Sequence, residues 1–319
     1  MTLFAERVGY SPGKRDCPAA RSGRSYTCVL DAEVSLFKSA EAEVSYRAAY
    51  DASLQLWPVQ RESIYIPTKF GLTHVLACGP VNGEPVLLLP AMACTATMWY
   101  ATVPALSTEF RCYAVDFPSD MGLSALDNPP ANRMDCVAWL RELLDGLGIV
   151  KASFVGASYG SFLALNYAIA EPARVKKIAL SSPAAGIVRL GMLFYARVFL
   201  SFLLPGRSAG DRIMARLFDG RFPLDNPVIR QLLVGIKTLK PHIKVYPMVF
   251  TDSELAGIPA PLYLILGEKE VCYNPWSAAK RLQRVMPTAS VEIVPGAGHL
   301  LVMERPDFVN QRLLAFLLD

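Results

Sequence analysis

The sequence has few histidines, and its cysteines and basic residues lack the arrangements that mark metal or nucleic-acid sites. Only three histidines occur in 319 residues, and the seven cysteines are irregularly spaced without a CxxC pair. The Cys/His ligand spacing of a zinc site is therefore absent. No stripe of lysine and arginine is interleaved with aromatics, and the formal net charge is only +4. We expect neither a metal site nor nucleic acid as a partner.

The chain also lacks a leader-like N-terminus and a long uninterrupted apolar run. Its first residues do not combine a basic stretch, an apolar run and a small-residue cleavage site, so we expect no secretory signal. The most apolar stretch, residues 186–204, is interrupted by Arg189 and Arg197 and is too short between them to span a bilayer. We interpret it as an amphipathic helix beside a pocket. The odd number of cysteines fits reduced thiols, and these features together predict a cytoplasmic protein.

The composition is that of a compact globular protein. Hydrophobic residues make up 52% of the chain and charged residues 19%, which is enough to bury a large core. Residues 1–33 are rich in proline, glycine, serine and basic residues without apolar periodicity, and we expect them to form a loosely held extension. Residues 34–319 are expected to form one catalytic domain, because a single α/β domain with one insertion reaches this length.

Strand-like and helix-like segments alternate along most of this domain. A helix is expected over residues 36–56, followed by a hairpin whose strands lie at 63–67 and 73–78. Short apolar runs bounded by turn residues predict six buried parallel strands, at 85–89, 111–117, 152–155, 177–181, 261–266 and 291–294. Helical patterns occur between most of them, at 133–147, 160–170, 277–285 and 305–318. This alternation predicts an α/β fold with a doubly wound, mostly parallel eight-stranded sheet.

The alternation stops between residues 184 and 258, where helical, apolar and proline-punctuated segments predict a helical cap inserted into the domain. No internal repeat of fixed period is present, which argues against a solenoid. Many apolar side chains of the cap would suit an acyl or alcohol pocket, and ordinary packing of the cap onto the core explains any one of them equally well. These side chains belong to Leu190, Met192, Leu193, Phe194, Tyr195, Phe199, Phe202 and Leu203.

The motif Gly156-Ala157-Ser158-Tyr159-Gly160 carries the clearest chemical signal. It matches G-x-S-x-G directly after a predicted strand and directly before a predicted helix, which is the context that this motif requires. Small residues two positions on each side permit a sharp turn that projects the Ser158 hydroxyl from the backbone. The helix N-terminus favours negative charge that develops there. We predict Ser158 as a nucleophile; the alternative is an inert serine in a glycine-flanked turn.

A serine nucleophile needs a base, and His299 is the best candidate. It follows the predicted strand VEIV in the loop Pro295-Gly296-Ala297-Gly298-His299, where a loop after the last strand can reach Ser158. His74 lies in the early hairpin and is expected to be a strand-surface or structural residue. His242 lies in the cap without a matching motif.

The third member of a triad should be a carboxylate that follows the penultimate strand. The strand LYLIL ends in Gly267-Glu268-Lys269-Glu270, and Glu270 lies where the loop has cleared the sheet edge. We choose Glu270 over Glu268, and a surface salt-bridge partner is the alternative role for both. An oxyanion hole also requires backbone N–H donors, each worth about 3 to 4 kcal/mol. We expect them from Tyr159, after the nucleophile, and from Met92 in the loop after VLLL.

With these motifs in order, the sequence resembles the α/β-hydrolase superfamily from about residue 60 to 319. The runs YDASLQLWPV, IPTKFGLTHVLACGP, TMWY, YAVD and GEKEVCYNP resemble bacterial carboxylesterase-like serine hydrolases that carry a helix before the first strand. This resemblance implies glutamate at the acid position, in agreement with Glu270. The chain departs from the family at Pro90-Ala91, where relatives commonly have His-Gly. Proline removes an N–H group and alanine disfavours positive φ, so the path of the oxyanion loop needs to be established.

The resemblance implies hydrolysis of carboxylic esters, through an acyl-enzyme on Ser158, without a metal or organic cofactor. The expected partner is a small apolar ester, and the sequence is equally compatible with a monomer and a homodimer. Amide, lactone and C–C bond hydrolysis use the same triad and stay open as alternatives, as does a non-catalytic binder of small apolar ligands.

Overall fold

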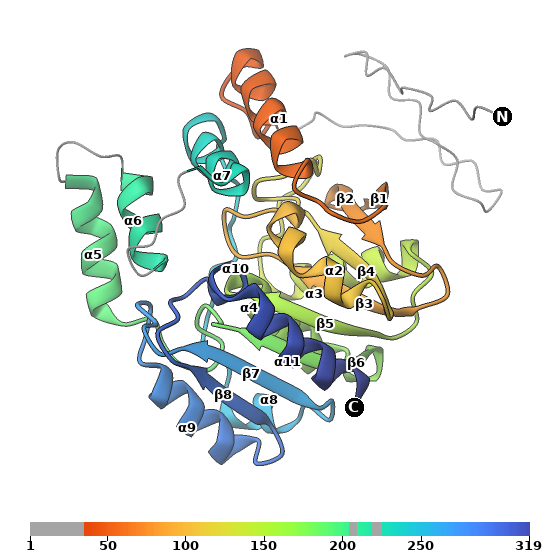
Figure 1. Cartoon of the computed structure of the whole chain (residues 1–319), viewed down its shortest axis with the longest axis vertical. Helices are drawn as coiled ribbons and strands as arrows, with labels where there is room; N and C mark the ends of the chain where they lie inside the picture. Colours follow the sequence, from red (N-terminus) through yellow and green to blue (C-terminus); the bar gives the residue numbers. More distant parts are fainter. Residues whose placement is uncertain (1–34, 204–208, 219–224) are drawn as a thin grey trace. The chain divides into compact units, whose positions relative to one another are not determined.

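The computed structural model describes residues 35–203, 209–218 and 225–319. The expected extension of residues 1–33 lies outside these described residues. Eight strands form one sheet in the order β1-β2-β4-β3-β5-β6-β7-β8, in which β2 is antiparallel to both its neighbours and the other pairs are parallel (Figure 1). This arrangement confirms the predicted fold class. The strands are β1 (Arg61–Thr68), β2 (Gly71–Cys78), β3 (Glu84–Leu89), β4 (Phe110–Val115), β5 (Ala152–Ala157), β6 (Val175–Ser181), β7 (Leu262–Gly267) and β8 (Ser290–Val294).

Helices occur between most strands and also form the insertion between β6 and β7. The α-helices are α1 (Ala40–Leu54), α2 (Val103–Leu106), α3 (Arg133–Gly146), α4 (Tyr159–Ala170), α5 (Met192–Leu203), α6 (Ala209–Leu217), α7 (Pro227–Thr238), α8 (Asp252–Ala256), α9 (Pro275–Val285), α10 (Leu301–Glu304) and α11 (Pro306–Leu318). Two 3₁₀ helices are η1 (Ala96–Ala101) and η2 (Pro172–Arg174). Within the described residues, no helix is long and apolar enough to cross a membrane.

The sheet has a hydrophobic core on each face, because successive residues of a strand point to opposite sides. On β3, Leu87 belongs to the core that contains Trp139 of α3 and Phe162 of α4. Its neighbour Leu88 belongs to the other core, with Leu313 of α11. Burying a side chain of this size contributes about 1.5 to 3 kcal/mol. Central strands that are apolar at every position are therefore held from both sides.

Helix α1 begins and ends where its sequence dictates. The Ser39 hydroxyl accepts a hydrogen bond from the N–H of Ala42 at 3.2 Å, which caps the first turn. The helix ends at Leu54, shortly before Trp57-Pro58. Tyr46 and Tyr50 are fully buried, as the helical pattern predicts.

Candidate active site

Ser158 lies between β5 and α4 in a strained backbone conformation, with φ of 50° and ψ of −108°. A non-glycine residue in such a conformation is costly and persists only where the surrounding structure enforces it. Here the N–H of Ser158 donates to the carbonyl of Ser181 at 2.9 Å, which ties the turn to the neighbouring strand. Ser158 therefore lies at the start of helix α4 and at the carboxyl end of the sheet. Ligand sites of open α/β folds occur at this end.

The two glycines of the motif are required by close backbone contacts. A Cβ atom on Gly156 would lie 2.5 Å from the nitrogen of Ser161, and one on Gly160 would lie 2.0 Å from the carbonyl oxygen of Leu89. The second contact also shows that the first turn of α4 lies directly against the end of β3. The loop that follows β3 is therefore held beside Ser158.

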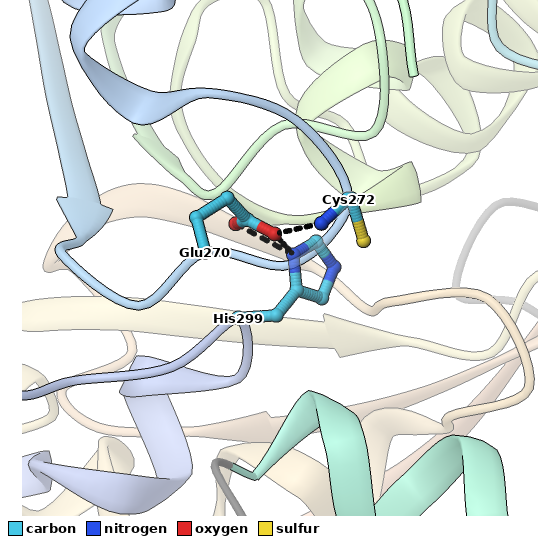
Figure 2. A group of neighbouring side chains, drawn as sticks. All are labelled: Glu270, Cys272 and His299. Atoms are coloured by element: carbon cyan, nitrogen blue, oxygen red, sulfur yellow. Dashed lines mark hydrogen bonds and ion pairs between the residues drawn. The ribbon is translucent and has the colours of Figure 1, made fainter. Parts of the chain in front are cut away.

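His299 and Glu270 lie next to Ser158 in the folded chain. The Nε2 atom of His299 is 2.9 Å from the Oγ atom of Ser158. On the other side of the ring, Nδ1 is 2.8 and 2.7 Å from the two carboxylate oxygens of Glu270 (Figure 2). All three residues are buried. The structure thus brings together the three residues that the sequence singled out, in the order serine, imidazole, carboxylate.

The loop after β7 holds the Glu270 carboxylate in place. The N–H of Cys272 donates to Oε1 of Glu270 at 2.9 Å. The alternative acid, Glu268, is exposed, and its carboxylate instead accepts from the N–H of Gly296 at 2.8 Å. Glu270, rather than Glu268, therefore contacts the imidazole, and Glu268 contacts the loop that leads to His299.

Burial and charge act on the pKa values of this pair in opposite directions. Burial alone lowers the pKa of His299, but the adjacent Cys272 and the Glu270 carboxylate more than offset this and raise the pKa well above 6.5. Burial raises the pKa of Glu270, whereas the charge of His299 and its hydrogen bond lower it more, so the net pKa is below the ordinary value. Glu270 is therefore placed to stabilise the imidazole when it gains a proton.

The loop with Pro90-Ala91 follows a path that needs no glycine at Ala91. The residue with positive φ is Ala93, at 62°, rather than Ala91. The N–H of Ala93 donates to Oδ2 of the buried Asp120 at 2.7 Å, and the N–H of Ala96 donates to Oδ1 of Asp116 at 2.7 Å. Two buried aspartates therefore hold the segment that follows Pro90-Ala91.

The two expected oxyanion donors lie on the segments that meet at this loop. Met92 lies in the loop after β3, and Tyr159 is the first residue of α4. Among the described residues, neither of these two backbone N–H groups has a hydrogen-bond partner. Both residues flank the place where the start of α4 lies against the end of β3.

His74 is fully buried, which fits the structural role and not the strand-surface position among the two roles expected for it. Its Nδ1 atom is 2.8 Å from Oδ2 of Asp116, and its Nε2 atom is 2.7 Å from the Ser63 hydroxyl. Asp116 also accepts from the Tyr50 hydroxyl at 3.0 Å. These bonds join α1, the first hairpin and the end of β4, and they account for this histidine without catalysis. His242 donates its backbone N–H to the carbonyl of Ser119 at 2.9 Å.

A cavity of about 280 Å³ opens beside the site. It lies between the start of α5 and the loop that carries Glu270. Its lining residues are Gly191, Leu193, Phe194, Arg197, Glu270, Val271, Cys272, Tyr273 and Asn274. Two of the apolar cap residues singled out in the sequence therefore line it.

Most apolar residues of α5 are nevertheless exposed, including Met192, Tyr195, Phe199 and Leu203, and Leu193 itself is 61% exposed although it borders the cavity. The side chain of Phe202 lies outside the described part. Leu190 and Phe194 pack against the core, as the alternative of ordinary cap packing expects, and the apolar pocket stays a prediction.

Three buried residues near the site were not predicted from the sequence, namely Asp116, Asp120 and Cys272. Asp116 directly follows β4 and Asp120 lies four residues further on, at the edge of the sheet where the carboxyl ends of parallel strands meet. Cys272 lies two residues after Glu270 in the same loop. Position alone could have signalled these residues, because polar groups after parallel strands converge at one edge.

Comparison with known proteins agrees with this geometry. Residues 86–312 match the model of the alpha/beta hydrolase family. The chain is 34% identical over 288 residues to carboxylesterase YbfK of Bacillus subtilis, covering 88% of this chain and 96% of that one. It is also 34% identical over 279 residues to the uncharacterized carboxylesterase nap of the same organism, covering 86% of this chain and 92% of that one.

A solved structure is equally similar. The crystal structure of naproxen esterase from Bacillus subtilis superposes with a TM-score of 0.82 at 33% identity, covering 88% of this chain and 99% of that one. The family match, the sequence identity over most of the chain and the sheet topology all agree. The chain belongs to the alpha/beta hydrolase family.

Proposed function

We propose that this protein is a serine carboxylesterase in which Ser158 is the nucleophile, His299 the general base and Glu270 the acid that orients it. The observation that carries the proposal is the hydrogen-bonded series from Ser158 Oγ through His299 to Glu270, with a separation of 2.9 Å between Oγ and Nε2. The strained backbone of Ser158 at a helix N-terminus supports it, because strain of this kind clusters at functional sites. The esterase names of the relatives support the same reaction.

The proposed reaction has two steps that share one base. Ser158 Oγ attacks the ester carbonyl while Nε2 of His299 takes the hydroxyl proton. The imidazolium then returns that proton to the leaving alcohol, which yields an acyl-enzyme on Ser158. Water, deprotonated by the same nitrogen, attacks the acyl carbonyl, and the imidazolium returns the proton to Ser158 Oγ as its bond to the acyl group breaks and the acid leaves. Glu270 stabilises the imidazolium and keeps the ring in the tautomer that points Nε2 at Ser158.

Met92 and Tyr159 are the proposed oxyanion donors. A tetrahedral intermediate carries its negative charge on the former carbonyl oxygen, and two unpartnered backbone N–H groups stabilise that charge without rearrangement. The N-terminus of α4 adds its positive end to the same position. This part of the proposal rests on the contact between α4 and the end of β3.

Small, largely apolar esters are the proposed substrates. The cavity beside Glu270 has a volume of about 280 Å³, which is near the lower end of the range for small-molecule sites, roughly 300 to 1,000 Å³. Leu193 and Phe194 supply apolar surface, while Arg197 and Asn274 supply polar groups. We further infer a cytoplasmic location, which the free thiols of the five described cysteines support.

Hydrolysis of p-nitrophenyl esters from acetate to palmitate tests the proposal, with wild type, Ser158→Ala and Ser277→Ala compared at pH 8. Ser277 is exposed on α9, so its replacement controls for the loss of a serine hydroxyl elsewhere. We expect turnover to peak at a short acyl chain, to fall by at least about a hundredfold in Ser158→Ala, and to stay unchanged in Ser277→Ala. Turnover that survives in Ser158→Ala would overturn the assignment. Absence of turnover on every ester would favour amide, lactone or C–C bond hydrolysis, or a purely binding role.

A further inference from the structure

The thiol of Cys272 lies beside the proposed base and acid, and the proposed reaction does not use it. One ligand atom each from Glu270, Cys272 and His299 lies within 4.8 Å of the others, and all three residues are buried. Figure 2 shows the cysteine side chain beside the imidazole ring, while its backbone N–H contacts the carboxylate. In the described part of the chain, no other group of three histidine, cysteine or acidic residues is gathered in this way.

This set of ligand atoms is chemically selective. A thiolate, an imidazole nitrogen and a carboxylate oxygen together suit Zn²⁺ and Cd²⁺, whereas Mg²⁺ and Ca²⁺ prefer oxygen alone. Zinc bond lengths of about 2.0 to 2.3 Å place the ligands of one tetrahedral ion roughly 3.3 to 3.6 Å apart. Side-chain shifts of about 1 Å would therefore bring these three atoms to binding distance of one ion.

The position of the cluster gives an ion both a route and a fourth ligand. Glu270 and Cys272 both line the cavity of about 280 Å³, so an ion can reach them from that side. A water molecule can complete a tetrahedral set, whereas the Ser158 hydroxyl contacts Nε2, on the other side of the ring from Glu270. Three protein ligands with an open fourth position are typical of an accessible site rather than a closed structural one.

We propose that Cys272, His299 and Glu270 bind one thiophilic divalent cation of the Zn²⁺ and Cd²⁺ class, and that the bound ion reversibly inhibits hydrolysis. An ion on these residues engages the imidazole and carboxylate that the reaction needs as base and orienting acid, so binding and turnover exclude each other. The binding claim stands on the three side chains alone, whereas the inhibition rests on the proposed function.

Binding is tested on the full-length wild type, Cys272→Ala and Cys136→Ala by titration with Cd²⁺, with thiolate-to-cadmium absorption and calorimetry as readouts. Cys136 is a buried thiol on α3, so its removal controls for the loss of any other cysteine. We expect one Cd²⁺ to bind to wild type and to Cys136→Ala, and to bind at least about tenfold more weakly to Cys272→Ala. Equal affinity in wild type and Cys272→Ala, or no binding to either, would overturn the proposal.

Inhibition is measured on the same three proteins with Zn²⁺ and p-nitrophenyl butyrate, each compared with its own metal-free rate. We expect chelation by EDTA to restore the rate, and the inhibition constant to rise at least about tenfold in Cys272→Ala only. Cadmium binding without any effect on turnover would overturn the inhibitory half. If no variant hydrolyses esters, the proposed function fails, while the cadmium titration still decides the metal site.

Discussion

The Nε2 atom of His299 lies 2.9 Å from the Oγ atom of Ser158, although 141 positions separate the two residues in the sequence. They follow β5 and β8, which are not neighbours in the sheet. Parallel strands point all their carboxyl ends to one edge, so loops from distant strands can meet there. The sheet thereby supplies the proximity that a serine and its base require.

The pKa of His299 should control the pH dependence of hydrolysis. The neutral imidazole is the active base, so kcat/KM should rise with pH as His299 loses its proton, with a midpoint above 6.5. Glu270→Gln removes the negative charge that raises this pKa, so the midpoint should move to lower pH. The plateau of kcat/KM at high pH should be about 10³- to 10⁴-fold lower in Glu270→Gln than in wild type, because the orienting acid is lost. Rate profiles from pH 5 to 10 for both proteins would test this, and an unchanged midpoint would contradict it.

Gly160 should be intolerant of any side chain. The added methyl group of Gly160→Ala would overlap the carbonyl oxygen of Leu89 at 2.0 Å and approach that of Pro90 at 2.7 Å. We expect a loss of about 3 kcal/mol in the free energy of unfolding, because backbone must move, together with loss of hydrolysis. Gly191→Ala is the matched control, since its nearest contact is an ordinary 3.5 Å to the carbonyl of Cys272. Its free energy of unfolding should change by less than about 0.5 kcal/mol.

Asp120 should position the oxyanion loop through the N–H of Ala93. Asp120→Ala removes the acceptor of this 2.7 Å bond, so we expect kcat to fall by about 10- to 100-fold with a smaller change in KM. Asp120→Asn keeps an oxygen acceptor and should restore most of the loss. Equal kcat in the alanine variant and wild type would show that the loop is held without this bond.

Burial also makes Asp120 a source of pH-dependent stability. Burial raises the pKa of the Asp120 carboxyl from 3.8 to about 7, although hydrogen bonds from the backbone of Ala93 and Met121 lower this pKa. Between these values the folded protein binds a proton that the unfolded chain has lost, so the free energy of unfolding falls as pH rises through this window. The total loss is of order 4 kcal/mol. Asp120→Asn should lack this contribution, which denaturant titrations at pH 5 and pH 8 can measure against wild type.

His74 should matter for stability rather than for chemistry. His74→Ala leaves the buried Asp116 without the imidazole at 2.8 Å, and we expect the free energy of unfolding to fall by about 3 kcal/mol. Ser63→Ala, which removes the hydroxyl on the other side of the ring, should lower it by only about 1 kcal/mol. The folded fraction of the His74→Ala and Ser63→Ala variants should still hydrolyse esters. Loss of turnover in folded His74→Ala would assign this histidine a catalytic part instead.

Local patterns predicted the sheet and the elements around Ser158 well, because buried strands and a glycine-bounded turn leave short-range signals. Several helix boundaries differed, among them the start of α1, which lies at Ala40 rather than residue 36 because Ser39 caps the helix. The helix expected from residue 186 begins at Met192, since Gly186 has φ of 73° and bridges to Val249. The last helix, expected from Arg305, begins at Pro306, and the short α10 precedes it.

Position after a strand could have placed Asp120 and Cys272 at the edge of the sheet, but their contacts, unlike those of the triad, were not predicted from the sequence. Asp120 supports the loop of Ala93, and Cys272 lies beside His299, only because segments far apart in the chain meet at the edge of the sheet. No periodicity or spacing encodes such a meeting. The choice between Glu268 and Glu270 could be argued from the loop, but the contact with His299 needed three-dimensional geometry.

Covalent labelling by a fluorophosphonate, followed by mass spectrometry of the labelled peptide, tests the central claim most directly. An activated serine beside a base reacts with this probe whichever ester is the natural substrate. We expect one label per chain on Ser158, with labelling abolished in Ser158→Ala and strongly slowed in His299→Ala. A label on another residue, or an unreactive Ser158 in folded protein, would contradict the assignment of Ser158 as the nucleophile.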